Sequence, residues 1–164
     1  MANKQNFTPE EWTRLLESPM TAGIAVSAAE PSGLWGTLKE AFAGSSALAS
    51  AKMNPDANEL VKAVVTDFEA AEGRSAIQKA LQTRFADSQP HDCVDRSLAN
   101  LREVSAILAA KAPGDATAFK AWLREISQKV AEAADEGGFM GFGGVKVSDA
   151  EKATLADIAK ALGT

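Results

Sequence analysis

Apolar residues recur at intervals of three and four along most of the chain, the spacing that gathers side chains on one face of a helix. The most regular stretch follows Pro113. Its apolar face carries Phe119, Trp122, Leu123, Ile126 and Val130. Strand-like alternation is confined to residues 145–147, which are too few to carry a sheet. The pattern therefore predicts an all-α chain.

The predicted first helix begins with a complete set of start signals. Thr8 is placed to cap it, Pro9 follows in the first turn, and Glu11 completes a capping box. Phe7 and Trp12 stand on either side of these residues at the spacing of a hydrophobic staple. We therefore expect a well-defined helix start directly after Thr8.

Four further helix boundaries are marked by single residues or pairs. Ser148 and Glu151 repeat the capping-box spacing before the last helix, and Gly163 is placed to close that helix. Asp56 and Asp115 each stand before another apolar stripe. We expect each of these two aspartates to cap the helix that follows it.

Two residues interrupt otherwise helical patterns. Pro19 lies inside the first apolar stripe, where it either kinks one long helix or separates two short ones. A helix turns by about 100° per residue, so an unbroken helix would place Phe68 and Ile77 on opposite faces. The simpler interpretation is a break at Gly73, after which Ser75 caps a new helix.

The composition supports this helical interpretation. Alanine, the strongest helix former, supplies 33 of the 164 residues, and tyrosine is absent. We find no fixed-period repeat and no interdomain linker. We therefore expect a single domain over residues 1–164, an up-and-down bundle of six to seven helices in which four longer helices form the core.

The charge balance restricts the possible partners. The chain has 22 acidic and 17 basic residues and a net charge of −5. This balance argues against a general nucleic-acid binder, which would carry a basic stripe. No run of apolar residues is long enough to cross a membrane. With one cysteine and no apolar leader at its N-terminus, the chain is expected to be cytoplasmic.

The histidine content limits the possible metal chemistry. Di-metal carboxylate sites in helical bundles need a Glu-x-x-His motif on each of two helices, and His91 is the only histidine. His91 and Cys93 lie close to Asp92 and Asp95, but their spacing is poor for a metal site or a nucleophile pair. We interpret the aspartates as helix-terminal charges and Cys93 as a packing residue, and we expect no cofactor and no metal.

Residues 18–51 contain only three charged side chains, and small residues fill the gaps between the apolar ones. A helix that is apolar or small on all sides is usually buried. The helices predicted in this stretch are therefore central to the bundle, or they form a contact surface with another subunit. On the second interpretation we expect a homodimer.

The glycine-rich segment 137–144 alternates glycine with large apolar side chains. Phe139, Met140 and Phe142 either pack against the end of the bundle or form an exposed contact for a partner or an apolar ligand. Core packing is the default interpretation for Trp35. These four residues are nevertheless the candidate ligand- or partner-binding residues of the chain.

Residues 136–163, together with the start Phe7–Trp12, resemble the corresponding parts of a group of small bacterial helical proteins. The chain also resembles ferritin-like bundle domains that lack metal ligands. This resemblance implies a ferritin-like bundle and a bacterial source, and it implies no activity and no site residues. We therefore expect a non-catalytic protein that acts by self-association or by binding a protein partner. The alternative is a binder of a small apolar ligand, or an enzyme, with a pocket near residues 137–144.

Overall fold

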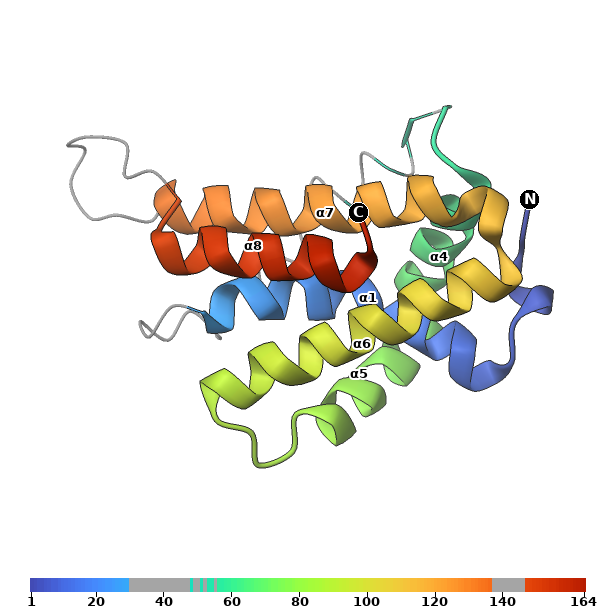
Figure 1. Ribbon diagram of the computed structural model, residues 1–164. Helices are drawn as coiled ribbons and strands as arrows, with labels where there is room; N and C mark the ends of the chain where they lie inside the picture. The colour runs from blue at the N-terminus through green and yellow to red at the C-terminus, as the bar shows by residue number, and fades with distance from the viewer. Residues whose placement is uncertain (30–47, 49–50, 52, 55, 137–146) are drawn as a thin grey trace.

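The computed structural model describes residues 1–29, 48, 51, 53–54, 56–136 and 147–164 (Figure 1). Within these ranges, a short 3-10 helix, η1 (Lys4–Asn6), precedes six α-helices. These are α1 (Pro9–Ala28), α4 (Glu59–Glu69), α5 (Ala71–Arg84), α6 (Pro90–Lys111), α7 (Pro113–Glu136) and α8 (Asp149–Leu162). The predicted all-α fold is confirmed.

Four helices form the core of the molecule. Each of α1, α6, α7 and α8 contacts the other three, and consecutive members of this group run in opposite directions (Figure 1). Three of them are the longest described helices, whereas α8 is only as long as α5, at 14 residues each. Helices α4 and α5 pack against α1, and α4 also contacts α7. No helix within the described ranges is long and apolar enough to cross a membrane.

The interior of this core is apolar. Each of its four helices contributes side chains that are almost completely removed from water. Examples are Leu15 from α1, Leu101 from α6, Phe119 and Leu123 from α7, and Ile158 from α8. Burying such a side chain contributes about 1.5–3 kcal/mol, so these contacts supply the main stabilisation of the fold.

The predicted helix-start signals act as expected at both ends of the chain. At the start of α1, Thr8 Oγ1 accepts from the Glu11 N–H at 3.2 Å, and Glu11 accepts from the Thr8 N–H at 2.8 Å. Ser148 and Glu151 make the same reciprocal pair of hydrogen bonds before α8. Gly163 ends α8 in the left-handed conformation, with φ of 70°.

Pro19 does not divide α1, which runs unbroken from Pro9 to Ala28. A proline has no N–H, so the carbonyl of Leu15 loses its usual helical donor. The hydroxyl of Ser18 donates to that carbonyl instead, at 2.7 Å. This local replacement explains how a buried proline is accommodated inside the central helix.

The chain breaks between α4 and α5, but three residues earlier than predicted. The break lies at Ala70, and Gly73 belongs to the first turn of α5, so Ser75 does not cap a helix. A Cβ atom on Gly73 would lie 1.8 Å from the carbonyl oxygen of Asp67. The glycine is therefore needed for the close approach of α5 to the end of α4, and not for the turn.

Two predicted helix caps are also wrong. Helix α4 is capped by Asn58, whose side chain accepts from the N–H groups of its first turn, and not by Asp56. Helix α7 begins at Pro113, which puts Asp115 inside its first turn. The Asp115 carboxylate points inward, where it accepts from the Ala2 N–H and the Asn58 amide, each at 2.8 Å.

The charge-poor stretch is only partly described. Its first part, residues 18–28, is the second half of α1, where every residue except Met20 is buried within this one chain. Central packing is therefore correct for this part, which is enclosed and not available to a second subunit. Residues 30–47, over which the same pattern predicts further helix, lie outside the described residues.

Candidate functional site

The candidate contact residues from the sequence lie outside the part of the chain that the structure describes. This applies to Trp35 and to Phe139, Met140 and Phe142 of the glycine-rich segment. Their packing against the bundle and their exposure to a partner therefore both stay predictions. The described residues point to a different region.

At the start of α6, Asp92 lies in the first turn of the helix and Cys93 packs in the interior, as predicted for these two residues. Asp92 accepts from the Gln89 N–H at 3.0 Å, while the exposed His91 places Nε2 3.1 Å from the Asp92 carboxylate. Cys93 is buried, and this burial raises the pKa of its thiol. Within the described ranges, no group of three or more His, Cys, Asp or Glu side chains is placed to hold a metal ion.

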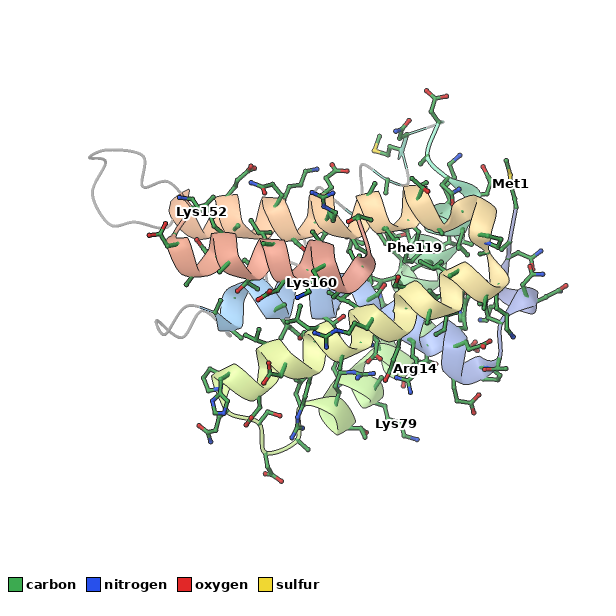
Figure 2. All side chains as sticks on the ribbon, viewed as in Figure 1. Met1, Arg14, Lys79, Phe119, Lys152 and Lys160 are labelled. Atoms are coloured by element: carbon green, nitrogen blue, oxygen red, sulfur yellow. The ribbon has the colours of Figure 1, made fainter. Side chains whose placement is uncertain are left out.

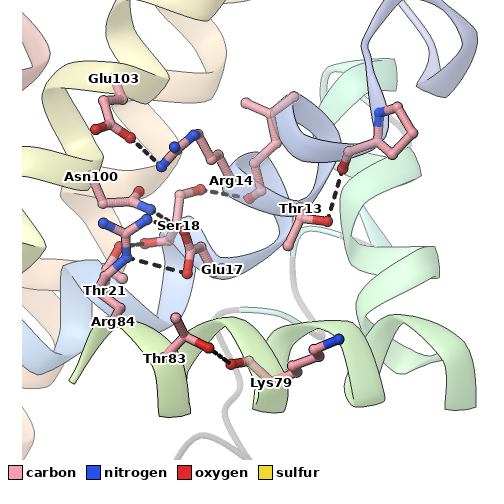
Figure 3. Close-up of polar contacts among 12 residues, drawn as sticks. Thr13, Arg14, Glu17, Ser18, Thr21, Lys79, Thr83, Arg84, Asn100 and Glu103 are labelled. Carbon is pink, nitrogen blue, oxygen red and sulfur yellow. Dashed lines mark hydrogen bonds and ion pairs between the residues drawn. The ribbon is translucent and has the colours of Figure 1, made fainter. Parts of the chain in front are cut away.

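The most unusual polar feature of the described chain is a carboxylate buried between three helices. Glu17 of α1 is only 1% exposed. Its Oε1 accepts from Arg84 Nη2 of α5 and from Asn100 Nδ2 of α6, each at 2.5 Å, and its Oε2 accepts from Arg84 Nε at 3.3 Å. Figure 3 shows how these three side chains converge. We call them the Glu17 cluster.

The energetics of the Glu17 cluster are those of a buried ion pair. Removing a carboxylate from water costs several kcal/mol, and two hydrogen bonds from one guanidinium offset much of that cost. Asn100 is fully buried, and its Oδ1 has no hydrogen-bond partner among the described residues. The cluster therefore adds little net stability, but it fixes the positions of α1, α5 and α6 because loss of any one partner is costly.

An open groove with a cavity volume of about 610 Å³ lies beside the Glu17 cluster. Side chains of α1 and α5 form most of its lining, and α6 adds Glu103. Arg14 and Lys79 lie on the same edge of the molecule, beside α5 (Figure 2). Three of the α5 residues that line the groove have short side chains: Ala76, Ala80 and Thr83. We call this region the α1–α5–α6 groove.

The groove carries three acidic and three basic side chains, so its formal charge is zero. Four of them are paired within the chain: Arg84 with Glu17, and Arg14 with Glu103. Figure 3 shows both pairs. The two that remain are Glu10 and Lys79. Neither has an ion pair with any residue that the structure describes, and both are exposed.

A second cavity, of about 300 Å³, lies near the start of α1. The contacts of its lining residues hold the start of α1 in place. Asp67 lines it and accepts from the Trp12 indole and the Lys4 ammonium group, each at 2.7 Å. Burial alone would raise the pKa of Asp67, but these two hydrogen bonds outweigh it and the pKa is lowered. The ring of Phe7 packs 5.7 Å from that of Trp12, as the predicted staple requires.

The comparisons with known proteins give no match. No family model matches the chain, and neither a curated protein nor a solved structure does so. The candidate site therefore rests on the geometry and the charges of this chain alone.

Proposed function

We propose that this chain is a non-catalytic helical-bundle protein that acts by self-association or by binding a protein partner through the α1–α5–α6 groove. The observation that carries this proposal is the groove itself, which combines small side chains with charges of both signs on a fixed frame. The proposal includes the dimeric state, the cytoplasmic location and the metal-free ferritin-like bundle expected from the sequence.

The shape and chemistry of the groove support a macromolecular partner. Small-molecule sites are deep and mostly apolar, with a few polar groups that orient the ligand. This groove is open and carries charges along its sides, as does the polar rim of a protein interface. Helices also bind in grooves between other helices, where small side chains permit close approach.

The Glu17 cluster supports the same proposal by fixing the walls of the groove. Arg84 joins α5 to α1, and Asn100 joins α6 to α1, through one buried carboxylate. A surface whose walls are already in place loses less conformational entropy when a partner binds. The buried cluster therefore has a role beyond its small net contribution to stability.

The alternative from the sequence, a small apolar ligand or a reaction near residues 137–144, depends on a segment outside the described residues. No observation on the described residues favours it. The groove proposal is the one that the described side chains support.

A photo-crosslinking residue in place of Ala80, inside the groove, tests the proposal. The matched control carries the same residue in place of Ala118, an exposed alanine of α7. We expect adducts from position 80 and none from position 118. The adduct joins two copies of this chain, or it joins this chain to another protein. In the second case the same adduct must form again when the two purified proteins are mixed. A monomeric mass by light scattering up to high micromolar concentration, together with no adduct from position 80, would overturn the proposal.

A further inference from the structure

We infer that the occupant of the α1–α5–α6 groove is a second copy of this chain, in a two-fold dimer that pairs Lys79 of each copy with Glu10 of the other. This inference rests on the proposed function and narrows it to one partner and one pair of contacts. The inference is argued from the net charge of the groove and from which of its charged side chains form ion pairs within the chain.

The net charge of the chain selects the kind of partner. At −5, two copies repel each other over most of their surfaces. The groove has no net charge, so a second acidic chain can approach it without this penalty. A nucleic acid finds no excess of positive charge there, and a strongly basic protein finds no excess of negative charge. Another copy of the chain fits the groove better than either.

Two-fold symmetry supplies the specific contacts. In an isologous interface the same patch meets itself, so two complementary charges on one face meet twice. Lys79 of α5 and Glu10 of α1 are such a pair, because both line the groove and neither has an ion pair with a described residue. The other four groove charges are already neutralised in pairs. Dimerisation through this face therefore leaves no groove charge without a partner.

The side chains between these charges allow close contact. Along α5, Ala76, Ala80 and Thr83 line the groove on the same side as Lys79. Short side chains let the backbone of a second copy come near without clashes. The long Lys79 and Glu10 side chains can then reach across to the second copy.

A charge-swap experiment tests the inference, with dimer dissociation constants measured by sedimentation at low salt. Lys79→Glu places two acidic groups opposite each other at both contacts, and Glu10→Lys places two basic groups there. We expect each single variant to weaken dimerisation by roughly tenfold or more, because like charges then face each other. The double variant Lys79→Glu/Glu10→Lys restores opposite charges and returns the dissociation constant to near the wild-type value.

Two features separate this effect from a general charge effect. Lys129→Glu on α7 makes the same change in net charge as Lys79→Glu, and it leaves the dissociation constant unchanged. Glu10→Lys makes the chain less acidic, so general repulsion predicts tighter association whereas the inference predicts weaker association. Circular dichroism melting curves establish that every variant is folded.

The outcomes distinguish this inference from the proposed function. Weakening by both single variants, with recovery in the double variant, supports the pairing. If the wild type forms a dimer and the variants have the same dissociation constant, the pairing of Lys79 with Glu10 is overturned but self-association is not. A wild-type protein that is monomeric at all concentrations overturns the second copy as the occupant, and the crosslinking at position 80 then decides the proposed function.

Discussion

The two sides of the central helix α1 are held in different ways. On one side it meets α7 and α8, which bury the apolar residues Phe119, Leu123, Ile126, Ile158 and Leu162. On the other side it meets α5, which buries only Gly73 and Ile77 of its 14 residues. The first contact depends on apolar area, and the second depends on polar groups in a fixed geometry.

Directional bonds hold the C-terminal end of α5. Arg84 binds the buried Glu17, and Arg96 of α6 donates to the carbonyl oxygens of Arg84 and Ala86, at 2.7 and 3.3 Å. Apolar contacts tolerate small shifts, whereas hydrogen bonds weaken steeply once their geometry is lost. With few apolar contacts, α5 is expected to open locally at a lower free energy than the four-helix core. As a wall of the groove, α5 is therefore held in position more by hydrogen bonds and an ion pair than by apolar packing.

The largest effect is expected on the apolar side. Phe119→Ala removes a fully buried ring and leaves a cavity beside α1, so the free energy of unfolding falls by about 3–5 kcal/mol. Urea denaturation followed by circular dichroism measures this loss. A loss below about 1 kcal/mol would contradict the apolar character of this side.

The corresponding change on the polar side is Arg84→Met, which leaves the Glu17 carboxylate buried with Asn100 as its remaining donor. We expect a loss of about 3 kcal/mol, since breaking a buried ion pair strands a charge. The double variant Glu17→Leu/Arg84→Met removes both charges and is therefore more stable than Arg84→Met. It stays about 1–3 kcal/mol below the wild type, because the buried Asn100 amide has then lost its acceptor.

Hydrogen exchange shows where the Arg84→Met effect lies. Amides of α5 exchange faster than in the wild type, while amides of α7 change in proportion to global stability only. Equal changes in both helices would mean that α5 and the core open together, which would remove the difference between the two sides of α1.

A smaller effect is expected at the contact between α4 and α5. Gly73→Ala puts a methyl group against the Asp67 carbonyl and forces the first turn of α5 to move, at a cost of about 1–3 kcal/mol. Gly114→Ala in the first turn of α7 is the matched control. Apart from its chain neighbours and the backbone of its own helix, no atom lies within 4 Å of the added methyl group. This variant is therefore neutral or more stable by up to about 1 kcal/mol. Thermal melts of the two variants check this difference, which would vanish if α5 could shift freely.

The same contrast explains what the sequence could predict. Apolar periodicity identified α1 and α7, because a core-facing stripe is a local pattern. The capping boxes at Thr8 and Ser148 gave their helix starts for the same reason. Asp56 and Asp115 are also good capping residues, but α4 is capped by Asn58 and α7 already begins at Pro113. A local signal does not specify which of several neighbouring residues begins the helix.

The Glu17 cluster was not predicted, because its members are far apart in sequence. Arg84 is 67 residues from Glu17 and Asn100 is 83 residues away, so no local pattern joins them. One signal was present: Asn100 lies four residues before the buried Val104, on the same face of α6. A polar residue on a buried face needs a partner, but the sequence does not say which one.

The smallest expected effect comes from a buried carboxylate at the start of α7. Asp115 is 5% exposed at the start of α7 and accepts from Ala2 and from Asn58. Burial would raise the pKa of this carboxyl, but the hydrogen bonds from Ala2 and Asn58 and the nearby N-terminal charge outweigh it, and the pKa is lowered. The unfolded chain has an Asp pKa of about 3.9. Asp115 therefore contributes stability that is present above about pH 4 and is lost as the pH falls through its lower folded-state pKa.

Asp115→Asn tests this carboxylate by removing the charge while keeping one acceptor. We expect the variant to be less stable than the wild type by about 1 kcal/mol at neutral pH, the size expected for one charge-assisted hydrogen bond. The difference shrinks as the pH falls below about 4, because the wild-type carboxyl then becomes neutral as well. Asp157→Asn, at an exposed position of α8, is the control for loss of one negative charge at neutral pH. Urea titrations from pH 7 down to about pH 3 measure both variants. A constant difference across this range would mean that Asp115 acts by its shape and hydrogen bonds alone, and not by its charge.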